Sequence, residues 1–251
     1  MPRKLGQHFL IREAILEQLA ASACGTHTPC VIEIGPGRGA LTRHLLPRTD
    51  ELHAMELDPS LANHLAAKFS DDPKLHIHTA DALALDWAQW GPAVIAGNLP
   101  YYITSPLLEK FLALDQSFAI AVFVMQWEVG ERLLARPGTR AYGYLTVAAR
   151  LACDLELVCR IPAAAFSPPP KVDSAGVRFG RKAEIPDDRK QFLEFVARCF
   201  AHKRKTLRNN LQPFYGAAID SLPEARLRAE QLTLDDFKRL FALLRSTPSR
   251  L

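Results

Sequence analysis

Short apolar runs alternate with helix-like segments over the first two-thirds of this chain. The apolar runs, which we predict to be strands, are Cys30–Ile34, Leu52–Met55, Leu75–His78, Ala93–Gly97 and Phe118–Met125. The helix-like segments between them lie near residues 39–47, 59–70, 83–90 and 105–114. Such alternation is typical of a parallel, doubly wound sheet. A hydrophobic content of 48% is enough to bury both faces of that sheet, so we predict an α/β fold.

The pattern changes in the last third of the chain. A helix-like stretch near 139–152 precedes extended segments at 153–160 and 172–179, which we expect to close the sheet with an antiparallel pair. A break at 181–188 follows, and beyond it the apolar residues recur at helical spacing, as in Phe192, Phe195, Val196, Cys199 and Phe200, and in Leu234, Phe237, Leu240, Phe241 and Leu244. Thr233 and Asp236 resemble a capping box. We therefore predict two domains, residues 1–184 and a small all-helical domain of residues 185–251, whose aromatic stripes form a core.

Several classes of protein are disfavoured by simple properties of the chain. No apolar run reaches the ~18 residues of a membrane span, and residues 1–10 lack the apolar core of a signal peptide. The five cysteines form no C-x-x-C pair, and they do not cluster with histidines at ligand spacing. We expect a cytoplasmic monomer with reduced thiols, without a metal and without a membrane partner.

The basic charge is concentrated at the C-terminal end. Residues 185–251 carry 13 Lys and Arg against 8 Asp and Glu, whereas residues 1–184 carry 18 against 19. The densest basic run, 202–208, includes the candidate RNA-binding residues Lys203, Arg204, Lys205 and Arg208. A solvated helix face would explain this run equally simply. A segregated basic excess nevertheless indicates a surface that binds a polyanion.

A glycine-rich turn follows the first predicted strand. Gly35, Gly37 and Gly39 permit a tight turn and the close approach of a ligand to the backbone. The loop also satisfies the G-x-G-x-x-A dinucleotide pattern, and Glu56 follows about 20 residues later, as a ribose-binding acid does. A nicotinamide-dependent oxidoreductase is therefore one hypothesis.

Two features favour S-adenosylmethionine (SAM) as the cofactor. Gly39 gives the pattern G-x-G-x-G, which we expect to leave an open pocket instead of a pyrophosphate cradle, and Asp81 after the third strand can accept a hydrogen bond from an adenine amino group. The glycine turn, Glu56 and Asp81 then follow successive strands whose ends line one crevice. Taken alone, Asp81 could be a helix N-cap and Glu56 a surface acid.

The fourth strand ends in Asn98-Leu99-Pro100-Tyr101. The Asn98 oxygen and the Leu99 carbonyl can each accept a hydrogen bond from an exocyclic amine. Pro100 fixes its own φ and restricts Leu99, and the Tyr101 ring can stack on a base. An ordinary strand-to-helix turn is the alternative. Together with the preceding strand ends, these residues predict a Rossmann-like SAM-dependent methyltransferase that acts on an adenine amine.

The chain closely resembles the KsgA/RsmA family of small-subunit (16S) ribosomal RNA adenine N6,N6-dimethyltransferases over nearly its whole length. The matching stretches are Leu5–Leu10, Glu33–Thr42, Glu56–Asp58, Asp81–Leu83, Asn98–Tyr101, Ile103–Pro106, Gln126–Arg132, Pro137-Gly138, Tyr142-Gly143, Ile161-Pro162, Phe166–Ser174 and Arg204–Leu211. The Phe166–Ser174 and Arg204–Leu211 blocks are the most specific, because the related macrolide-resistance RNA methyltransferases share the first half but match these two blocks poorly.

The resemblance implies dimethylation of N6 of two adjacent adenosines in the 3′-terminal hairpin loop of 16S rRNA, in the 30S subunit precursor, with a role in small-subunit biogenesis. It implies that the catalytic residues are Asn98, Leu99, Pro100, Tyr101 and Phe166. Phe166 would be a second stacking platform on the opposite face of the adenine, with a core Phe beside a rigid proline run as the alternative. The SAM-binding residues that it implies are Gln7, His8, Leu10, Gly35, Gly37, Glu56, Leu57, Asp81, Ala82 and Asn98; from the residues alone, 2–10 reads as a flexible basic arm.

Three positions depart from the pattern of the family. Tyr102 stands where Asn is usual, Trp127 where a basic residue is usual, and His8 where Asn is common. Trp127 is expected to alter an RNA contact. Two further hypotheses stay open: a non-catalytic ribosome-assembly factor, and an adenine methyltransferase that acts on DNA.

Overall fold

The computed structural model describes residues 7–114 and 118–245 and divides the chain into two compact units. The first unit comprises residues up to 130 together with 154–181, and the second comprises 131–153 together with residues from 182 onward. This division differs from the predicted boundary between residues 184 and 185, because Tyr142, Val147 and Leu151 are buried in the hydrophobic core of the helical unit. Sequence periodicity alone did not reveal that long-range packing.

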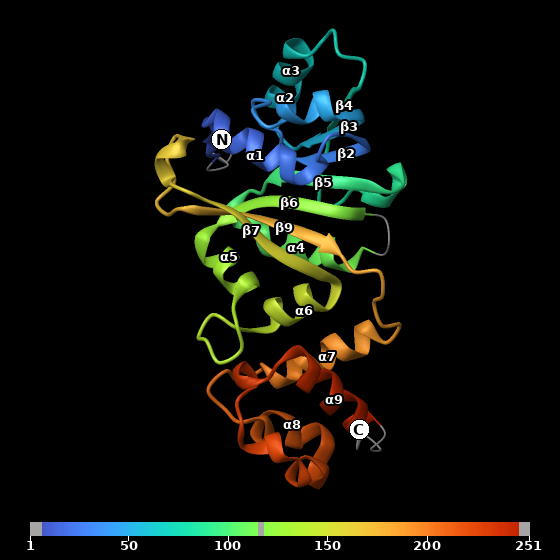
Figure 1. The fold of residues 1–251 in the computed structure, drawn as a ribbon, viewed down its shortest axis with the longest axis vertical. Coiled ribbons are helices and arrows are strands. Elements are labelled where there is room, and N and C mark those ends of the chain that lie inside the picture. Colours follow the sequence, from blue (N-terminus) through green and yellow to red (C-terminus); the bar gives the residue numbers. More distant parts are fainter. Residues whose placement is uncertain (1–6, 115–117, 246–251) are drawn as a thin grey trace. The chain divides into compact units, whose positions relative to one another are not determined.

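A seven-stranded sheet forms the centre of the first unit, in the order β4-β3-β2-β5-β6-β9-β7 (Figure 1). Its strands are β2 (Thr28–Ile34), β3 (Thr49–Glu56), β4 (Leu75–Thr79), β5 (Ala93–Asn98), β6 (Phe118–Gln126), β7 (Cys153–Ile161) and β9 (Ser174–Arg181). The strands from β4 to β6 pair in parallel, whereas β9 runs antiparallel to β6 and β7 lies at the edge beside it. The predicted α/β fold and all five predicted parallel strands are confirmed.

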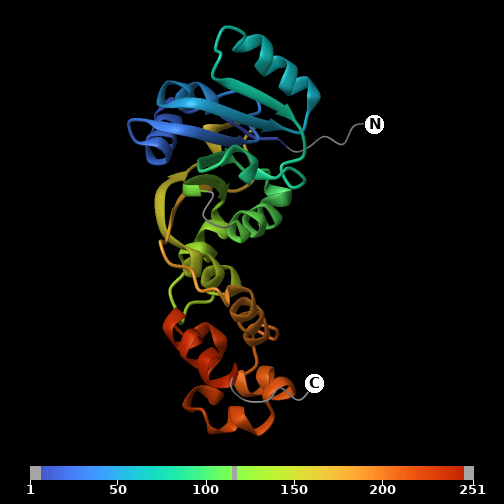
Figure 2. The ribbon, with the colours of Figure 1, turned by 90° about the vertical axis from the view of Figure 1, so that its right-hand side faces the viewer.

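Helices cover both faces of the sheet (Figures 1 and 2). On one face, Leu16 and Leu19 of α1 (Glu13–Cys24) pack in one core with Val122 and Val124 of β6. On the other face, Phe111 of α4 (Thr104–Ala113) contacts Phe123 of β6 edge to face, with ring centroids 5.1 Å apart. Alternate residues of β6 thus point to opposite faces, as the pleat of a strand requires.

Two local predictions differ from the structure. The segment 83–90 holds turns and a short 3₁₀ helix, η2 (Trp87–Trp90), instead of one helix. Asp86 interrupts the segment there, because its side chain accepts a hydrogen bond from the Ala88 amide and caps η2. Helix α1 has no counterpart among the predicted helices, although its apolar residues recur at helical spacing. The helices α2 (Thr42–Leu45) and α3 (Pro59–Lys68) lie inside predicted helical segments.

The N-terminal arm is held in place where the structure describes it. Strand β1 (Phe9–Leu10) pairs antiparallel with β8 (Phe166–Ser167), so Leu10 lies opposite Phe166. The prediction of a flexible arm is therefore wrong for residues 9 and 10, because backbone pairing with a distant segment orders them. Residues 2–6 of that arm lie outside the described residues.

The second unit is helical. It contains α6 (Tyr144–Ala152), α7 (Arg189–Cys199), α8 (Leu207–Tyr215) and α9 (Leu234–Arg245), and α5 (Trp127–Leu134) crosses the division between the units (Figure 1). Phe192, Phe195 and Phe237 are buried, so the aromatic stripes form a core as predicted. The capping box also forms, because the Asp236 amide donates to Thr233 Oγ1 and Asp236 Oδ2 accepts from the Thr233 amide. Among the described residues, no helix is long and apolar enough to cross a membrane.

Candidate active site

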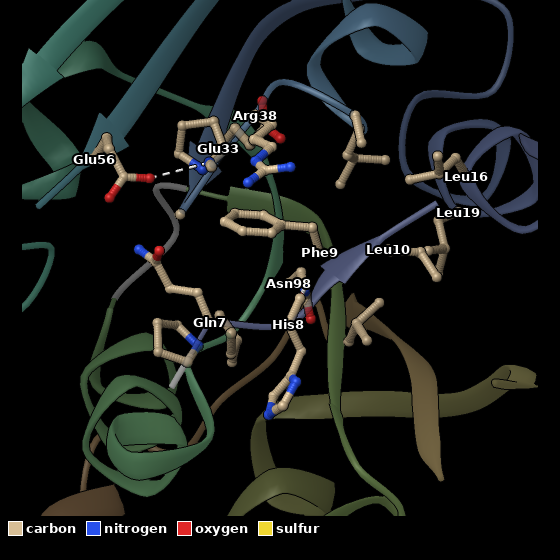
Figure 3. A pocket seen from close by; sticks show the side chains of 18 of the residues that line it. Gln7, His8, Phe9, Leu10, Leu16, Leu19, Glu33, Arg38, Glu56 and Asn98 are labelled. Atoms are coloured by element: carbon tan, nitrogen blue, oxygen red, sulfur yellow. Dashed lines mark hydrogen bonds between the residues drawn. The ribbon is translucent and has the colours of Figure 1, made fainter. Parts of the chain in front are cut away.

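A hollow of roughly 810 Å³, open to solvent, lies where β2, β3 and β5 end. The register places Ile34 of β2 beside both Met55 and Gly97, so the residues that follow these strands meet at one edge of the sheet. The hollow also receives residues 7–10 of the arm and Leu16 and Leu19 of α1 (Figure 3).

The glycine turn forms one wall of the hollow. Gly35, Gly37 and Gly39 have φ of +66°, +58° and +74°, which is the left-handed region that glycine tolerates. A Cβ on Gly37 would lie 2.9 Å from the Phe9 ring, so the arm closes against this turn. A Cβ on Gly39 would lie 2.6 Å from Phe69. Gly39 therefore serves helix packing, which corrects the prediction that it opens the pocket.

Glu56 joins the end of β3 to the glycine turn. Its Oε2 accepts a hydrogen bond from the Gly37 amide at 3.0 Å, drawn in Figure 3, and its Oε1 accepts one from the Asp58 amide at 3.0 Å. The residue is 5% exposed, so it is not the surface acid of the alternative interpretation. Each carboxylate oxygen has a second lone pair, so the group retains acceptor capacity toward a ligand.

Glu33, which sequence reasoning did not select as a site residue, also lines the hollow. Its Oε2 accepts a hydrogen bond from Thr42 Oγ1 at 2.7 Å. Burial, reinforced by the nearby charge of Glu56, raises the pKa of the Glu33 carboxyl to about 8. A carboxyl group inside the otherwise apolar run Val31–Ile34 was the available signal, because a buried strand rarely carries an acid. Phe9 and Arg38 also line the hollow without having been predicted, with the Arg38 guanidinium 4.6 Å from the Phe9 ring centroid.

A second, smaller hollow shares Gln7, Gly35, Glu56 and Pro100 with the first. It brings together three more predicted cofactor residues, Leu57, Asp81 and Ala82. Asp81 Oδ1 accepts from the Leu83 amide at 2.8 Å, so this side chain caps a turn at the same time. Tyr102, one of the departures from the family pattern, is 57% exposed and lines this hollow. Each predicted cofactor residue therefore lines one or both of these two hollows, which lie at the ends of neighbouring strands.

The Asn98 turn lies between the arm and β6. Asn98 Nδ2 donates to the His8 carbonyl at 2.9 Å, while Asn98 Oδ1 is buried without a hydrogen-bond partner. Buried polar atoms are nearly always paired, so this lone acceptor at the edge of a hollow is a position where a ligand can donate a hydrogen bond. Leu99 and Pro100 line the same hollow, and the Leu99 amide donates to the Val124 carbonyl at 2.9 Å.

The rings of Tyr101 and His8 lie face to face, with centroids 5.7 Å apart. The Tyr101 hydroxyl and Ser174 Oγ are 2.7 Å apart, and His8 Nδ1 lies 2.8 Å from the Pro168 carbonyl. Burial raises the pKa of Tyr101, against the opposing effect of its hydrogen bond to Ser174. The ring is thus fixed at both its face and its hydroxyl.

Phe166 does not join this set. It is 2% exposed and belongs to the core cluster that contains Leu10 and Leu16. The prediction of an accessible stacking platform is therefore replaced by the alternative, a core phenylalanine. Its backbone pairing with Leu10 gives the physical reason, because that pairing turns the residue inward beside the arm.

Comparison with known proteins agrees with this arrangement. The model of the family described as "Ribosomal RNA adenine dimethylase" matches residues 1–245. The chain belongs to the ribosomal RNA adenine dimethylase family. A Syntrophotalea carbinolica relative, named "Ribosomal RNA small subunit methyltransferase A", is 39% identical over 256 residues and covers 96% of each chain. The family predicted from the sequence motifs is thereby confirmed.

Two solved structures show how far the dimethylase fold extends. A dimethyladenosine transferase from Plasmodium falciparum has a TM-score of 0.81 at 25% identity, covering 94% of this chain and 96% of that one. The 23S rRNA methyltransferase ErmE has a TM-score of 0.74 at 29% identity, covering 95% of this chain and 100% of that one. The likeness to ErmE thus extends beyond the first half of the chain, although the two specific sequence blocks had suggested a sharper difference.

The candidate RNA-binding residues lie in the second unit. Lys203, Arg204 and Lys205 are exposed in the turn between α7 and α8. They are therefore not part of a solvated helix face. Lys203 Nζ donates to the Arg140 carbonyl, while Arg208 forms an ion pair with Asp220. Arg208 is thus the least available of the four predicted cations. The described residues contain no group of three or more His, Cys, Asp or Glu side chains that could hold a metal ion.

Proposed function

We propose that this protein is a SAM-dependent methyltransferase that dimethylates N6 of adenosines in 16S rRNA. The observation that carries the proposal is the buried, unpartnered Asn98 Oδ1 at the end of β5. An adenine amino group offers the donor that this oxygen lacks. The family relationship supports the same chemistry, because the relatives are named for small-subunit rRNA methylation and dimethyladenosine transfer.

The residues present fit SAM. Gly35 and Gly37 would hold the methionine end, Glu56 the ribose hydroxyls, and Leu57, Asp81 and Ala82 the adenine, while Gln7, His8 and Leu10 would cover the cofactor. The hollow is bordered by two buried carboxyl groups, Glu33 and Glu56. When bound there, SAM supplies a methyl group that is activated by the positive charge on its sulfur.

The chain's own residues would prepare the adenine amine. Asn98 Oδ1 and the Leu99 carbonyl each accept a hydrogen bond from N6, which draws the nitrogen toward a tetrahedral geometry and directs its lone pair at the methyl group. The Tyr101 ring, held by Ser174, stacks on an adenine extruded from the RNA. Such positioning can lower a barrier by ~7–11 kcal/mol. No general base is required, since the product cation loses its proton to water.

Dimethylation adds a requirement for rotation of the amine. After the first transfer N6 retains one hydrogen, so only one of the two acceptors remains hydrogen-bonded to it. We propose further that the targets are two adjacent adenosines in the 3′-terminal hairpin loop. In this proposal the protein is a cytoplasmic monomer that methylates a 30S precursor during small-subunit biogenesis. The basic turn at Lys203–Lys205 would contact RNA phosphates.

The decisive experiment combines labelled SAM with 30S particles that lack these methylations, followed by nucleoside mass spectrometry of digested RNA. We expect N6,N6-dimethyladenosine with the wild-type chain and none with Asn98→Ala. Monomethyladenosine alone would contradict dimethylation. If the chain bound 30S tightly but did not methylate it, the hypothesis of a non-catalytic assembly factor would be favoured. If it methylated a matched DNA hairpin and not 30S, the proposal of an RNA substrate would be wrong. Calorimetry with SAM and with NAD tests the cofactor separately.

A further inference from the structure

A separate hollow lies close to the Asn98 turn. It is lined by Gln126, Trp127, Glu128, Arg160, Val172 and Asp173. Gln126, the last residue of β6, pairs in register with Ser174, the first residue of β9. Ser174 is the residue whose Oγ contacts the Tyr101 hydroxyl. The lining of the hollow thus includes the register partner of Ser174, Gln126, and the residue that precedes Ser174, Asp173.

Trp127 and Arg160 form a stacked pair inside this hollow. The central carbon of the Arg160 guanidinium lies 4.5 Å from the Trp127 ring centroid. Arg160 Nε donates to Asp173 Oδ2 at 3.0 Å, and a second guanidinium nitrogen lies 3.0 Å from the same oxygen. The Trp127 amide donates to the Asp173 carbonyl at 3.0 Å. Asp173 therefore holds both members of the pair.

The pair is accessible from solvent. The Arg160 side chain is 59% exposed, although its guanidinium is already bound to Asp173. Val172, beside it, is 46% exposed, which is unusual for a branched apolar residue. A flat indole, a flat guanidinium and an apolar side chain thus border one open hollow.

The charges indicate which part of an RNA fits. The Arg160 cation is neutralised by Asp173, and Glu128 adds a carboxylate to the lining. A phosphate would meet a guanidinium that is already paired with Asp173, whereas a nucleobase would meet an indole and a guanidinium on which it can stack. The hollow therefore matches a base and not the backbone.

We propose that Trp127 and Arg160 form a stacking subsite for a nucleobase of single-stranded RNA beside the target adenosine. This proposal rests on the proposed function, because it deepens the substrate contacts of that same site. Trp127 is the residue that departs from the basic residue usual in the family.

Fluorescence of the full chain tests the contact without requiring methyl transfer. Hexaadenylate should quench part of the tryptophan emission of the wild-type chain, and Trp127→Phe should remove that component. Trp90→Phe is the matched control, because Trp90 stacks on His53 elsewhere in the same unit and should leave the quenching in place. Inorganic polyphosphate should quench nothing. Equal quenching by polyphosphate, or quenching that persists in Trp127→Phe, would overturn the proposal.

Binding and turnover then separate stacking from structural support. We expect Trp127→Ala to weaken 30S binding about 5- to 100-fold without changing the dependence of that binding on salt. The same variant should raise KM for the 30S particle and leave kcat and SAM affinity unchanged. Trp127→Lys should recover binding with a steeper salt slope. Unchanged 30S affinity in Trp127→Ala would refute the subsite. If the wild-type chain fails to methylate 30S while hexaadenylate still quenches Trp127, the proposed function fails and the stacking contact stands.

Discussion

Asn98 and His8 are joined by a hydrogen bond that spans 90 residues of sequence, from the Asn98 Nδ2 to the His8 carbonyl. The bond orients the amide, because only its NH₂ group can face a carbonyl oxygen. It therefore leaves Oδ1 as the acceptor in the hollow and fastens the N-terminal arm over the same hollow. The Asn98 side chain thus contacts the arm that would cover the cofactor through Nδ2 and offers Oδ1 to the adenine amine.

We predict that Asn98→Asp abolishes methylation and also weakens SAM binding by 10-fold or more. The carboxylate places an acceptor against the His8 carbonyl, so the arm loses its bond and meets repulsion, at a cost of about 1–3 kcal/mol. Calorimetric titration with SAM measures this effect. Asn98→Ala is the matched comparison, because it removes the donor to the His8 carbonyl without adding the repulsion. If Asn98→Asp bound SAM as tightly as the wild type, the arm would not depend on this bond.

The strand ends could be predicted from sequence because each polar group directly follows an apolar run. That adjacency was enough to select Glu56, Asp81 and Asn98 as site residues, together with the rule that parallel strands end at one edge of the sheet. Phe166 could not be placed in the same way. Its burial depends on pairing with Leu10, more than 150 residues earlier, and no local pattern encodes such a partner.

Gly37 and Gly39 show the same limit at short range. Both glycines were expected to shape the ligand pocket. Because they belong to one motif, the sequence gave no means of assigning them different roles. The structure separates them by their neighbours, since Gly37 faces Phe9 of the arm and Gly39 faces Phe69, which directly follows α3. Only the positions of residues distant in sequence distinguish a pocket glycine from a packing glycine.

We predict that Gly37→Ala lowers SAM affinity by 10-fold or more. The new Cβ would lie 2.9 Å from the Phe9 ring at a φ of +58°, so the arm and the turn must separate. Gly91→Ala is a matched control, because Gly91 has a φ of +76° with nothing within 4 Å of the added carbon. Both variants carry backbone strain of about 1–2 kcal/mol, but only Gly37→Ala should lose SAM affinity in calorimetry. Equal SAM affinities would refute the close fit of the arm.

Glu33 makes stability depend on pH. Burial raises the pKa of this carboxyl from 4.5 to about 8, so the folded state binds more protons than the unfolded state between those values. Stability should therefore fall as pH rises through this interval, by on the order of 1 kcal/mol per pH unit from this group. Urea unfolding of the wild type and Glu33→Gln at pH 5 to 8.5 measures the difference. Glu33→Gln should gain stability relative to the wild type as pH rises, and curves that stay parallel would contradict the raised pKa.

The basic turn in the second unit predicts a salt-dependent contact with RNA. Replacing Lys203, Arg204 and Lys205 together with Ala should weaken 30S binding by 10-fold or more at low salt and reduce the log–log salt slope by about 2. The reason is that each phosphate contact releases counterions, whereas a stacked base does not. Binding measured at salt concentrations from about 50 to about 200 mM gives that slope.

Two single variants sharpen this test. Lys238→Ala removes an exposed cation from α9 and should leave the salt slope unchanged. Arg208→Ala should have less effect than removal of any one residue of the turn, because Arg208 is already paired with Asp220. SAM affinity should be unchanged in every variant, since these residues lie outside the unit that contains the hollow. A triple variant that binds 30S like the wild type at every salt concentration would exclude the turn from the RNA interface.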